Sequence, residues 1–341
     1  MTLMDALLDA PLSPSDALPT ARADAAAGLS AQAVVFEGDK RLGLRELELI
    51  EPHADDIVVD VEWSGVSTGT ERLLWSGDMP PFPGMGYPLV PGYEAIGRVA
   101  RADVRPALLG RRVFVPGSHG FKNAKGLFGA SAARVVVPAE RATVIDDGLG
   151  EGGVLLALAA TAYHAMAGAD APDLIVGHGV LGRLLARIAI AVGAQPPVVW
   201  EIDPERADGD GYAVIDPECD GRSDYRSIYD VSGDASIIDR LVAHMARGGE
   251  IVLAGFYTTP LSFTFPPAFM KEARLRVAAE WAPSDLERVL ALLDDGALSF
   301  DGLITHRCAA RDAPEAYRTA FEDSACLKMV LDWREMHDGR L

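Results

Sequence analysis

The sequence is poor in cysteine and in positive charge, and both shortages exclude classes of protein. Only three of the 341 residues are cysteine, at positions 219, 308 and 326, and no two of them form a C-x-x-C pair. A disulfide framework or a cysteine-rich zinc lobe is therefore excluded as an organising feature. Lys and Arg number 31 against 50 Asp and Glu, which gives a net charge of −19. Such a chain is unsuited to binding nucleic acid or anionic lipid through charge.

Long apolar runs are also lacking. No stretch of about 18 consecutive apolar residues occurs, and the most apolar segment, 154–166, is interrupted by Thr161, Tyr163 and His164. Asp5 stands where a signal peptide would carry Lys or Arg. We therefore expect no membrane span and a cytoplasmic protein.

The composition is that of a globular protein large enough for two domains. Hydrophobic residues make up 49% and charged residues 24%, ordinary values for a folded chain. At about 100–200 residues per domain, this length favours two. Residues 1–30 are rich in Ala, Asp, Ser and Pro and contain no aromatic residue, so we expect a disordered extension there.

Short strands separated by glycine and proline follow the extension. We expect them at 33–38, 42–49, 56–63, 89–100, 111–116 and 131–138. Several short strands at this spacing predict a β-barrel or sandwich-like unit.

The pattern changes near residue 151, where helices and strands begin to alternate. We expect helices at 152–169, 181–192 and 235–246, and strands at 173–179, 197–201, 213–215, 228–233, 250–256 and 275–281. This alternation predicts βαβ units and a parallel sheet. Beyond it we expect strands at 302–307 and 326–333, a helix opened by a capping box from Ser284 to Glu287, and a helix at 312–321 with Asp312 as its N-cap.

A glycine fingerprint stands at the first strand-to-helix turn of the alternating region. The segment 177–182, Gly-His-Gly-Val-Leu-Gly, has the spacing G-x-G-x-x-G between an apolar strand and an amphipathic helix. Glycines there permit a tight turn and the approach of a pyrophosphate to the helix N-terminus. The cofactor-binding residues expected from this motif are Gly177, His178, Gly179, Val180, Leu181 and Gly182. Two interpretations of His178 stay open: its side chain contacts phosphate or substrate, or it points to solvent.

Glu201 follows the next strand, 19 residues after Gly182. A carboxylate there accepts hydrogen bonds from both ribose hydroxyls and repels a 2′-phosphate, so NAD is favoured over NADP. Arg206 partly offsets this preference, and a plain surface carboxylate is the alternative for Glu201. Further cofactor contacts are expected at the end of a later strand, from Gly255, Phe256 and Tyr257.

Three motifs resemble the medium-chain dehydrogenase/reductase superfamily. They are GVSTGTE (65–71), VPGYEAIGRV (90–99) and GHGVLG (177–182), and the resemblance covers about residues 31–333. Where zinc members of that superfamily have a Cys ligand, this chain has Ser67 or Thr68, and where they have Gly-His-Glu it has Tyr93 before Glu94. Because a zinc site needs three or four converging ligands, the resemblance implies a zinc-free member with no bound metal.

The resemblance to the bacteriochlorophyllide a dehydrogenase family is more specific. It lies in 67–94, 173–191, 248–257, 265–281, 301–307 and 325–334. It implies NAD-dependent oxidation of the 3-(1-hydroxyethyl) group of a magnesium bacteriochlorin, so the partner is a magnesium tetrapyrrole.

The two resemblances together imply an α/β protein with a GroES-like β-barrel-type domain and a Rossmann domain. The implied GroES-like catalytic domain comprises 31–150 and 285–341, and the implied Rossmann NAD-binding domain comprises 151–284.

A carbinol attached to a conjugated macrocycle places modest demands on its enzyme. As hydride leaves, positive charge delocalises into the ring, which lessens the need for a Lewis acid. Positioning and a proton acceptor remain necessary. The candidate catalytic residues are Ser67, Thr68, Thr70, Tyr93, Glu94 and His119, with the hydroxyls relaying a proton to His119 or to water. A purely structural role is the alternative for each of them.

A flat apolar pigment needs an aromatic cleft with few polar anchors. The candidate substrate-binding residues are Trp75, Phe82, Met85, Tyr87, Phe121, Lys122 and Phe128, with the lysine facing a propionate. Packing in the core or at a homodimer contact is the alternative for these aromatic residues. Two other functions also remain open: a zinc-free quinone or enone reductase, and a dinucleotide-binding protein without turnover.

Overall fold

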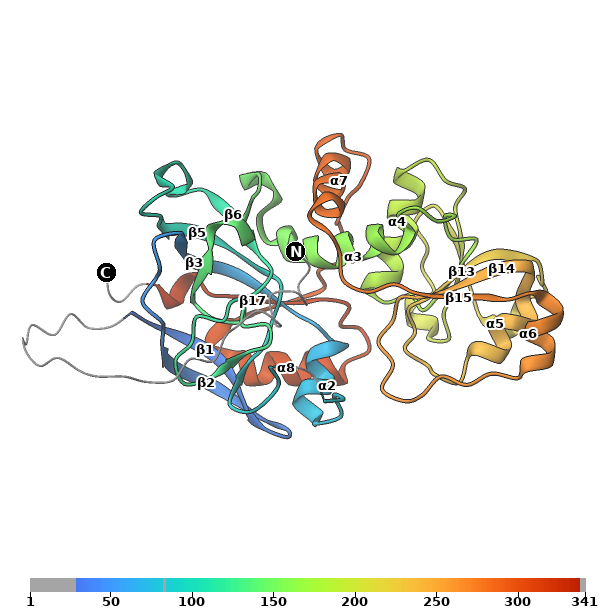
Figure 1. The fold of residues 1–341 in the computed structure, drawn as a ribbon, viewed down its shortest axis with the longest axis horizontal. Coiled ribbons are helices and arrows are strands. Elements are labelled where there is room, and N and C mark those ends of the chain that lie inside the picture. The colour runs from blue at the N-terminus through green and yellow to red at the C-terminus, as the bar shows by residue number, and fades with distance from the viewer. Residues whose placement is uncertain (1–28, 82–83, 338–341) are drawn as a thin grey trace, which may run out of the picture.

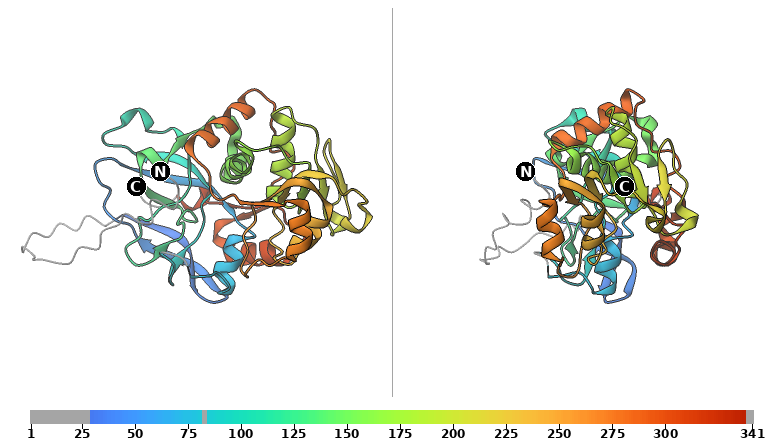
Figure 2. Two further views of the ribbon diagram at one scale, coloured as in Figure 1. Left: turned by 45° about the vertical axis from the view of Figure 1, so that its right-hand side comes forward. Right: turned by 90° about the vertical axis from the view of Figure 1, so that its right-hand side faces the viewer.

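The structure is a computed structural model that describes residues 29–81 and 84–337. Within these residues the chain forms two units arranged along the long axis of the molecule (Figures 1 and 2). One unit is built mainly on antiparallel strands and the other on a parallel sheet. The expected extension 1–30 lies outside the described residues except for Leu29 and Ser30, and Ser30 already begins the first strand.

The first unit holds two sheets. The smaller one has the order β2-β1-β4-β7, and the larger one the order β16-β17-β3-β5-β6-β9, with β8 paired to β3. The strands are β1 (Ser30–Gly38), β2 (Arg41–Glu48), β3 (Asp56–Val66), β4 (Leu89–Val90), β5 (Ala95–Arg101), β6 (Arg112–Val115), β7 (Lys125–Gly126), β8 (Arg134–Pro138), β9 (Thr143–Val144), β16 (His306–Ala309) and β17 (Met329–Asp332). Helices α2 (Thr70–Ser76) and α8 (Ala313–Glu322) accompany them.

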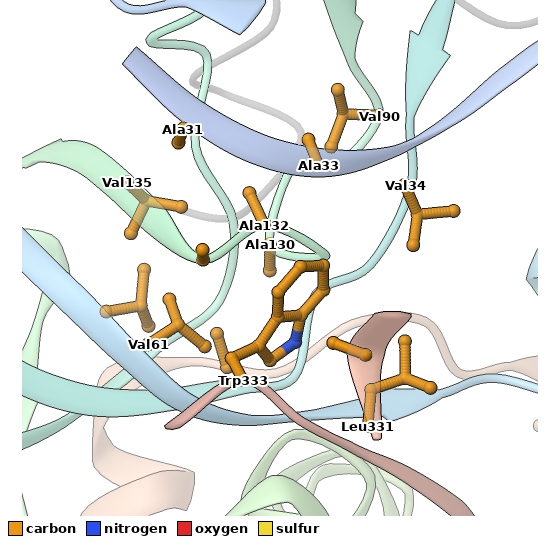
Figure 3. Close-up of a cluster of buried hydrophobic side chains, with 14 of the residues drawn as sticks. Ala31, Ala33, Val34, Val61, Val90, Ala130, Ala132, Val135, Leu331 and Trp333 are labelled. Atoms are coloured by element: carbon orange, nitrogen blue, oxygen red, sulfur yellow. The ribbon is translucent and has the colours of Figure 1, made fainter. Parts of the chain in front are cut away.

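The C-terminal strand returns into this first unit and is fixed there by a buried tryptophan. β17 runs antiparallel to β3, with Leu331 opposite Ser64. Trp333 is fully buried, and its Nε1 donates to the Ser64 Oγ at 2.8 Å. Figure 3 shows its indole among side chains that include Val61 and Ala130. Burial of an indole with its N–H satisfied anchors the returning strand to β3.

The second unit is a parallel sheet in the order β12-β11-β10-β13-β14-β15. Its strands are β10 (Leu174–Val176), β11 (Val198–Trp200), β12 (Ala213–Ile215), β13 (Tyr225–Asp230), β14 (Met245–Leu253) and β15 (Arg274–Val277), and its helices are α4 (Val180–Ala191), α5 (Ile238–His244) and α6 (Phe265–Lys271). If these six strands are numbered 1 to 6 along the chain, their order across the sheet is 3-2-1-4-5-6, which is the Rossmann arrangement. The predicted α/β fold with a parallel sheet is confirmed.

Helices α3 (Leu156–Met166) and α7 (Pro283–Asp294) lie at the junction of the two units (Figure 1). The Nδ1 of His164 in α3 lies 2.7 Å from Oδ2 of Asp285 in the first turn of α7. A second contact joins the two units, because the Arg206 Nε of the second unit donates to the Ser324 carbonyl of the first at 2.9 Å. The remaining helical turns are η1 (Pro106–Leu108), η2 (Ala139–Arg141), η3 (Asp147–Leu155), η4 (Pro204–Arg206), η5 (Pro217–Cys219), η6 (Ala310–Asp312) and η7 (Arg334–Met336).

Some local predictions are wrong. Ser284 does not cap α7, because the helix begins at Pro283 and Asp285 Oδ2 accepts from the backbone N–H of Ala282. The strand expected at 302–307 starts at His306 instead. Asp312 does occupy the N-cap of α8, although its side chain makes no capping bond. Of the helices in the described part of the chain, none has the length and apolarity to span a membrane.

Candidate active site

The glycine fingerprint lies between β10 and α4, as its spacing predicts. Gly177 adopts φ +101°, a conformation that side chains rarely allow. A Cβ at Gly182 would lie 2.0 Å from the Gly177 carbonyl oxygen, so the helix packs directly on the turn. Gly179 is the N-cap of α4, and a Cβ there would meet no atom within 4 Å. The N-terminus of a 12-residue helix is therefore open to a phosphate group, and this cradle fits a dinucleotide.

Glu201 is held at the mouth of this turn by backbone donors. Its Oε2 accepts from the N–H of His178 at 3.0 Å, and its Oε1 accepts from Ile202 and Asp203 at 2.8 and 2.9 Å. The carboxylate is half-buried and is fixed beside the fingerprint. This position suits a ribose contact, because Oε2 accepts only one of these bonds and has a further lone pair to offer.

The solvent-facing alternative for His178 is wrong. Its side chain has no exposed surface. Nδ1 lies 2.6 Å from the Arg206 carbonyl and Nε2 lies 2.8 Å from the Tyr212 hydroxyl. Burial lowers the pKa of His178, which favours the neutral ring. The ring thus fastens the segment after Glu201 onto the fingerprint.

The segment after β14 reaches the same edge of the sheet. The N–H groups of Ala254 and Gly255 both donate to the Asp230 carbonyl at the end of β13. The Tyr257 hydroxyl donates to Asp230 Oδ2 at 2.7 Å, and Phe256 is 47% exposed. Because β13 lies next to β10, these residues border the fingerprint at the carboxyl edge, where Rossmann folds bind ligands.

Four of the six catalytic candidates come together where β3 ends and β5 begins. Pairing of β3 with β5 places Ser67 next to Tyr93, and the Tyr93 hydroxyl donates to Ser67 Oγ at 2.8 Å. The side chain of Thr70 lies near the Tyr93 hydroxyl. Enclosure by protein, followed by the charge of Glu94, raises the pKa of Tyr93, so the phenol stays protonated at neutral pH.

Glu94 is one half of a buried ion pair, in keeping with the structural role that its sequence left open, but the partner, Lys328, was not expected. Lys328 Nζ pairs with Glu94 Oε2, and the two residues are 1% and 0% exposed. A Cβ at Gly65 would lie 2.2 Å from that oxygen, so glycine makes room for the pair. Burial raises the pKa of Glu94 and the ammonium of Lys328 opposes the shift. A lysine inside the apolar strand expected at 326–333 was the available signal.

A second buried carboxyl lies beside the first and was also missed. Glu71, in the first turn of α2, is 1% exposed. Its Oε1 accepts from the N–H of Ser67 at 3.0 Å, and its Oε2 accepts from the Tyr317 hydroxyl at 2.6 Å. Burial raises the pKa of Glu71 to about 7, against the effect of these two donors. Glu71 ends the quoted motif GVSTGTE, but a helix-forming residue at that position gave no sign of burial.

The two remaining catalytic candidates have different surroundings. Thr68 is half-buried on the turn between β3 and α2. His119 packs against Gly126, where a Cβ would lie 3.3 Å from the His119 Cα, and lies near Arg141. His119 is exposed. Partial desolvation of its ring, followed by the guanidinium of Arg141, lowers the pKa of His119, which favours the neutral imidazole.

The substrate candidates do not form one cluster. Phe128 lies edge-on to Tyr93 with ring centroids 5.7 Å apart. Trp75 packs against Phe321 of α8 at 5.4 Å and lines a cavity of about 510 Å³ with Arg311 and Arg318. The Tyr87 hydroxyl donates to the Leu74 carbonyl at 2.6 Å, and Met85 packs on the hydrophobic core. Phe121 is buried and its backbone forms a β-bridge with Leu49. Lys122 forms an ion pair with Glu48. Phe82 lies outside the described residues.

Metal ligands do not converge in the part of the chain that the structure describes. Across 29–81 and 84–337, no three His, Cys, Asp or Glu side chains are placed to hold one ion. At the motif where zinc relatives carry ligands, the hydroxyls of Ser67 and Tyr93 are hydrogen-bonded to each other. Glu94 forms an ion pair with Lys328.

Comparison with curated proteins identifies the relatives of this chain. It is 60% identical over 314 residues to the 2-desacetyl-2-hydroxyethyl bacteriochlorophyllide A dehydrogenase of Cereibacter sphaeroides, covering 89% of this chain and 98% of that protein. It is 55% identical over 315 residues to the protein of that name from Rhodobacter capsulatus, covering 90% and 99%. The chain belongs to this dehydrogenase family. No family model matches it.

Solved structures of dehydrogenases share the fold. The 2R,3R-butanediol dehydrogenase of Bacillus subtilis superposes with a TM-score of 0.77 at 21% identity, over 89% of this chain and 99% of the other. An Escherichia coli alcohol dehydrogenase in complex with NADH gives 0.76 at 20% identity, over 89% and 100%. A zinc-binding dehydrogenase homologue from Sinorhizobium meliloti bound to NADP gives 0.75 at 21%, over 89% and 99%. At this identity the likeness concerns the fold, which confirms a GroES-like unit joined to a Rossmann unit.

Lys328→Met tests the buried ion pair. The substitution leaves Glu94 buried without a counter-charge, so we expect unfolding free energy to fall by about 3–5 kcal/mol, measured by urea denaturation. Lys328→Met combined with Glu94→Gln should recover much of this loss. Arg45→Met removes the exposed pair with Glu37 and should cost less than about 1 kcal/mol. Equal stability of Lys328→Met and the parent protein would contradict the pairing.

Proposed function

We propose that this protein oxidises the 3-(1-hydroxyethyl) group of a magnesium bacteriochlorophyllide to acetyl, with NAD⁺ as the hydride acceptor. The observation that carries the proposal is a chain 60% identical to a hydroxyethyl bacteriochlorophyllide dehydrogenase that holds an open dinucleotide cradle in one unit and a hydroxyl pair, Ser67 and Tyr93, in the other. The product is a conjugated ketone, and the reaction releases one proton.

The hydroxyl pair suits the binding of a carbinol. Ser67 Oγ accepts from Tyr93, so its own hydrogen remains available to a substrate oxygen. Neither hydroxyl can act as a terminal base, because the pKa of Tyr93 is raised and that of a serine hydroxyl is high. Their role is to orient the carbinol, and the proton that the reaction releases passes to water. Phe128, edge-on to Tyr93, offers a neighbouring apolar face to the macrocycle.

The cofactor is proposed to be NAD rather than NADP. Glu201 is fixed beside the fingerprint, where its charge repels a 2′-phosphate. Arg206 is the nearby cation that could bind a 2′-phosphate, but its guanidinium donates instead to the Ser324 carbonyl of the other unit. When bound, the nicotinamide supplies the hydride acceptor.

A homodimer is proposed through the open edge of the parallel sheet. β15 ends that sheet, and Leu275 and Val277 on it are 38% and 75% exposed. Helix α6, which precedes β15, exposes Phe265, Phe269 and Met270 by 66%, 64% and 71%. An edge strand has backbone N–H and C=O groups without a partner strand, and together with exposed apolar residues it favours pairing with another strand. The β15 strand of a second copy can pair with this edge about a two-fold axis, so that both copies use the same surface.

The activity is tested by mixing protein, NAD⁺ and a 3-hydroxyethyl bacteriochlorin and following the shift of the pigment's absorption. We expect one NADH per acetyl group formed, with activity retained in EDTA. Tyr93→Phe should lower kcat by about 10- to 100-fold while NAD⁺ binding is kept. Tyr163→Phe, a tyrosine on α3, is the matched control and should behave as the parent.

The outcome separates the alternatives. Turnover of a quinone or enone with NADPH, and none of the pigment, would favour the reductase. Dinucleotide binding without turnover of either substrate would favour a non-catalytic protein. Loss of activity in EDTA, restored by zinc, would contradict the metal-free site.

Glu201→Ala tests cofactor selection. Loss of a charged acceptor should weaken NAD⁺ binding by about 1–3 kcal/mol and narrow the preference over NADP⁺, as measured by calorimetric titration. Glu205→Ala removes an exposed carboxylate four residues later and serves as control. Unchanged affinity for both dinucleotides in Glu201→Ala would remove the carboxylate from the ribose site.

Val277→Lys tests the dimer. A charge at this exposed apolar position of β15 should shift the protein from dimer to monomer in sedimentation equilibrium. Val104→Lys, on an exposed loop of the first unit, should leave the mass unchanged. A monomeric parent protein would overturn this part of the proposal.

A further inference from the structure

Glu71 is a buried carboxyl group held between the backbone of Ser67, one member of the hydroxyl pair, and helix α8. It accepts one hydrogen bond from the backbone of Ser67 and another from the hydroxyl of Tyr317 on α8. The side chain is 1% exposed, so no hydration shell replaces these bonds. Its two oxygens are therefore both acceptors as the structure stands.

Tyr317 has a second acceptor within reach. Its hydroxyl oxygen lies 2.6 Å from Glu71 Oε2 and 3.3 Å from Ser131 Oγ. While Glu71 is ionised, the hydroxyl donates to the carboxylate. A proton on Glu71 belongs on Oε2, because Oε1 faces the donor N–H of Ser67. That proton would donate to the Tyr317 oxygen, and the tyrosine hydrogen would turn to Ser131.

Both ends of this hydrogen-bond chain touch the backbone around the Ser67–Tyr93 pair. Glu71 holds Ser67 by its N–H. The N–H of Ser131 donates to the Pro91 carbonyl at 2.9 Å. A Cβ at Gly92 would lie 2.4 Å from Ser131 Oγ, so this serine packs against the residue that precedes Tyr93. A change in the donors around Tyr317 is thus transmitted to both hydroxyls.

The charges that face Glu71 place its titration near neutrality. Burial raises its pKa to about 7, the carboxyl of Glu94 on β5 also raises it, and Tyr317, the Ser67 N–H and the ammonium of Lys328 lower it. Lys328 is already paired with Glu94. One cation therefore serves two buried carboxyls, and Glu71 is the one left to take up or lose a proton.

We propose that Glu71, Tyr317 and Ser131 form a proton-linked hydrogen-bond switch that positions the Ser67–Tyr93 pair, with ionised Glu71 as the working state. This rests on the proposed alcohol oxidation. As hydride leaves, the carbinol carbon gains positive charge and its hydroxyl loses a proton. A nearby carboxylate favours both changes, whereas the protonated acid withdraws that charge and rearranges the donors around the pair. Glu71 and Tyr317 act here as positioning residues.

The kinetic test is the pH dependence of kcat for pigment oxidation between about pH 5.5 and 9. The parent should show a limb that rises with pH near neutrality. Glu71→Gln mimics the protonated acid, so its kcat should lie about 10- to 100-fold lower with the limb absent. Tyr317→Phe removes a donor to the carboxylate, which raises the pKa of Glu71, so the limb should move up by about one to two pH units.

Tyr229→Phe is the matched control. This tyrosine is fully buried in the Rossmann unit and its hydroxyl donates to the Asp170 carbonyl at 2.8 Å. It should cost some stability and leave the limb where it is in the parent. An equal shift in Tyr229→Phe and Tyr317→Phe, or an unchanged limb in Glu71→Gln, overturns the proposal.

A second measurement needs no turnover. The folded protein holds the Glu71 proton more tightly than the unfolded chain, whose carboxyl has its usual pKa of about 4.3. Folding stability from this group is present below that value and lost as pH rises toward about 7. The melting temperature of Glu71→Gln relative to the parent should therefore increase between about pH 5 and 8. A constant difference shows that Glu71 does not titrate there and overturns the switch, whether or not the pigment is the substrate.

Discussion

The meeting of strands β3, β5 and β17 around buried charge is the constraint on which the first unit depends. Lys328 enters this meeting from the segment before β17, and Glu94 from the segment before β5. Two ions without water are tolerable only if they are in contact. The C-terminal strand must therefore be in register beside β3 before the carboxylate of Glu94 is neutralised. The indole of Trp333, bonded to Ser64, fixes that register.

This buried pair also explains the shape of the site. Glu94 is neutralised by Lys328, so it is removed from the set of groups that could hold a cation. Tyr93 and Ser67 are turned toward each other, because a phenol enclosed by protein needs an acceptor. What results is a surface of hydroxyl groups that can orient an alcohol. The chemistry left to the protein is positioning and proton transfer, which is enough for an alcohol that becomes a conjugated ketone.

The architecture could be predicted from local patterns, and the chemistry of the site could not be predicted in full. Alternation of apolar strands and helices, with glycines at 177, 179 and 182, determined the Rossmann unit, because turn geometry and periodicity are local properties. The pair of Ser67 and Tyr93 could be named because each stands in a motif. Glu71, Tyr317 and Lys328 could not, since 246 residues separate Glu71 from Tyr317. His178 was open to both interpretations because its burial depends on a segment 28–34 residues further along the chain.

The residues around the hydroxyl pair come from widely separated parts of the sequence. Ser67, Tyr93, Tyr317 and Lys328 come from four segments, and the last two belong to the returning part of the chain after the Rossmann unit. Arg206 of the Rossmann unit also holds that part, through the Ser324 carbonyl. The segment 313–333 is therefore held to the Rossmann unit through Arg206 and to the surroundings of the hydroxyl pair through Tyr317 and Lys328. A displacement of this segment would therefore change the contacts around the hydroxyl pair and the contact with the Rossmann unit together.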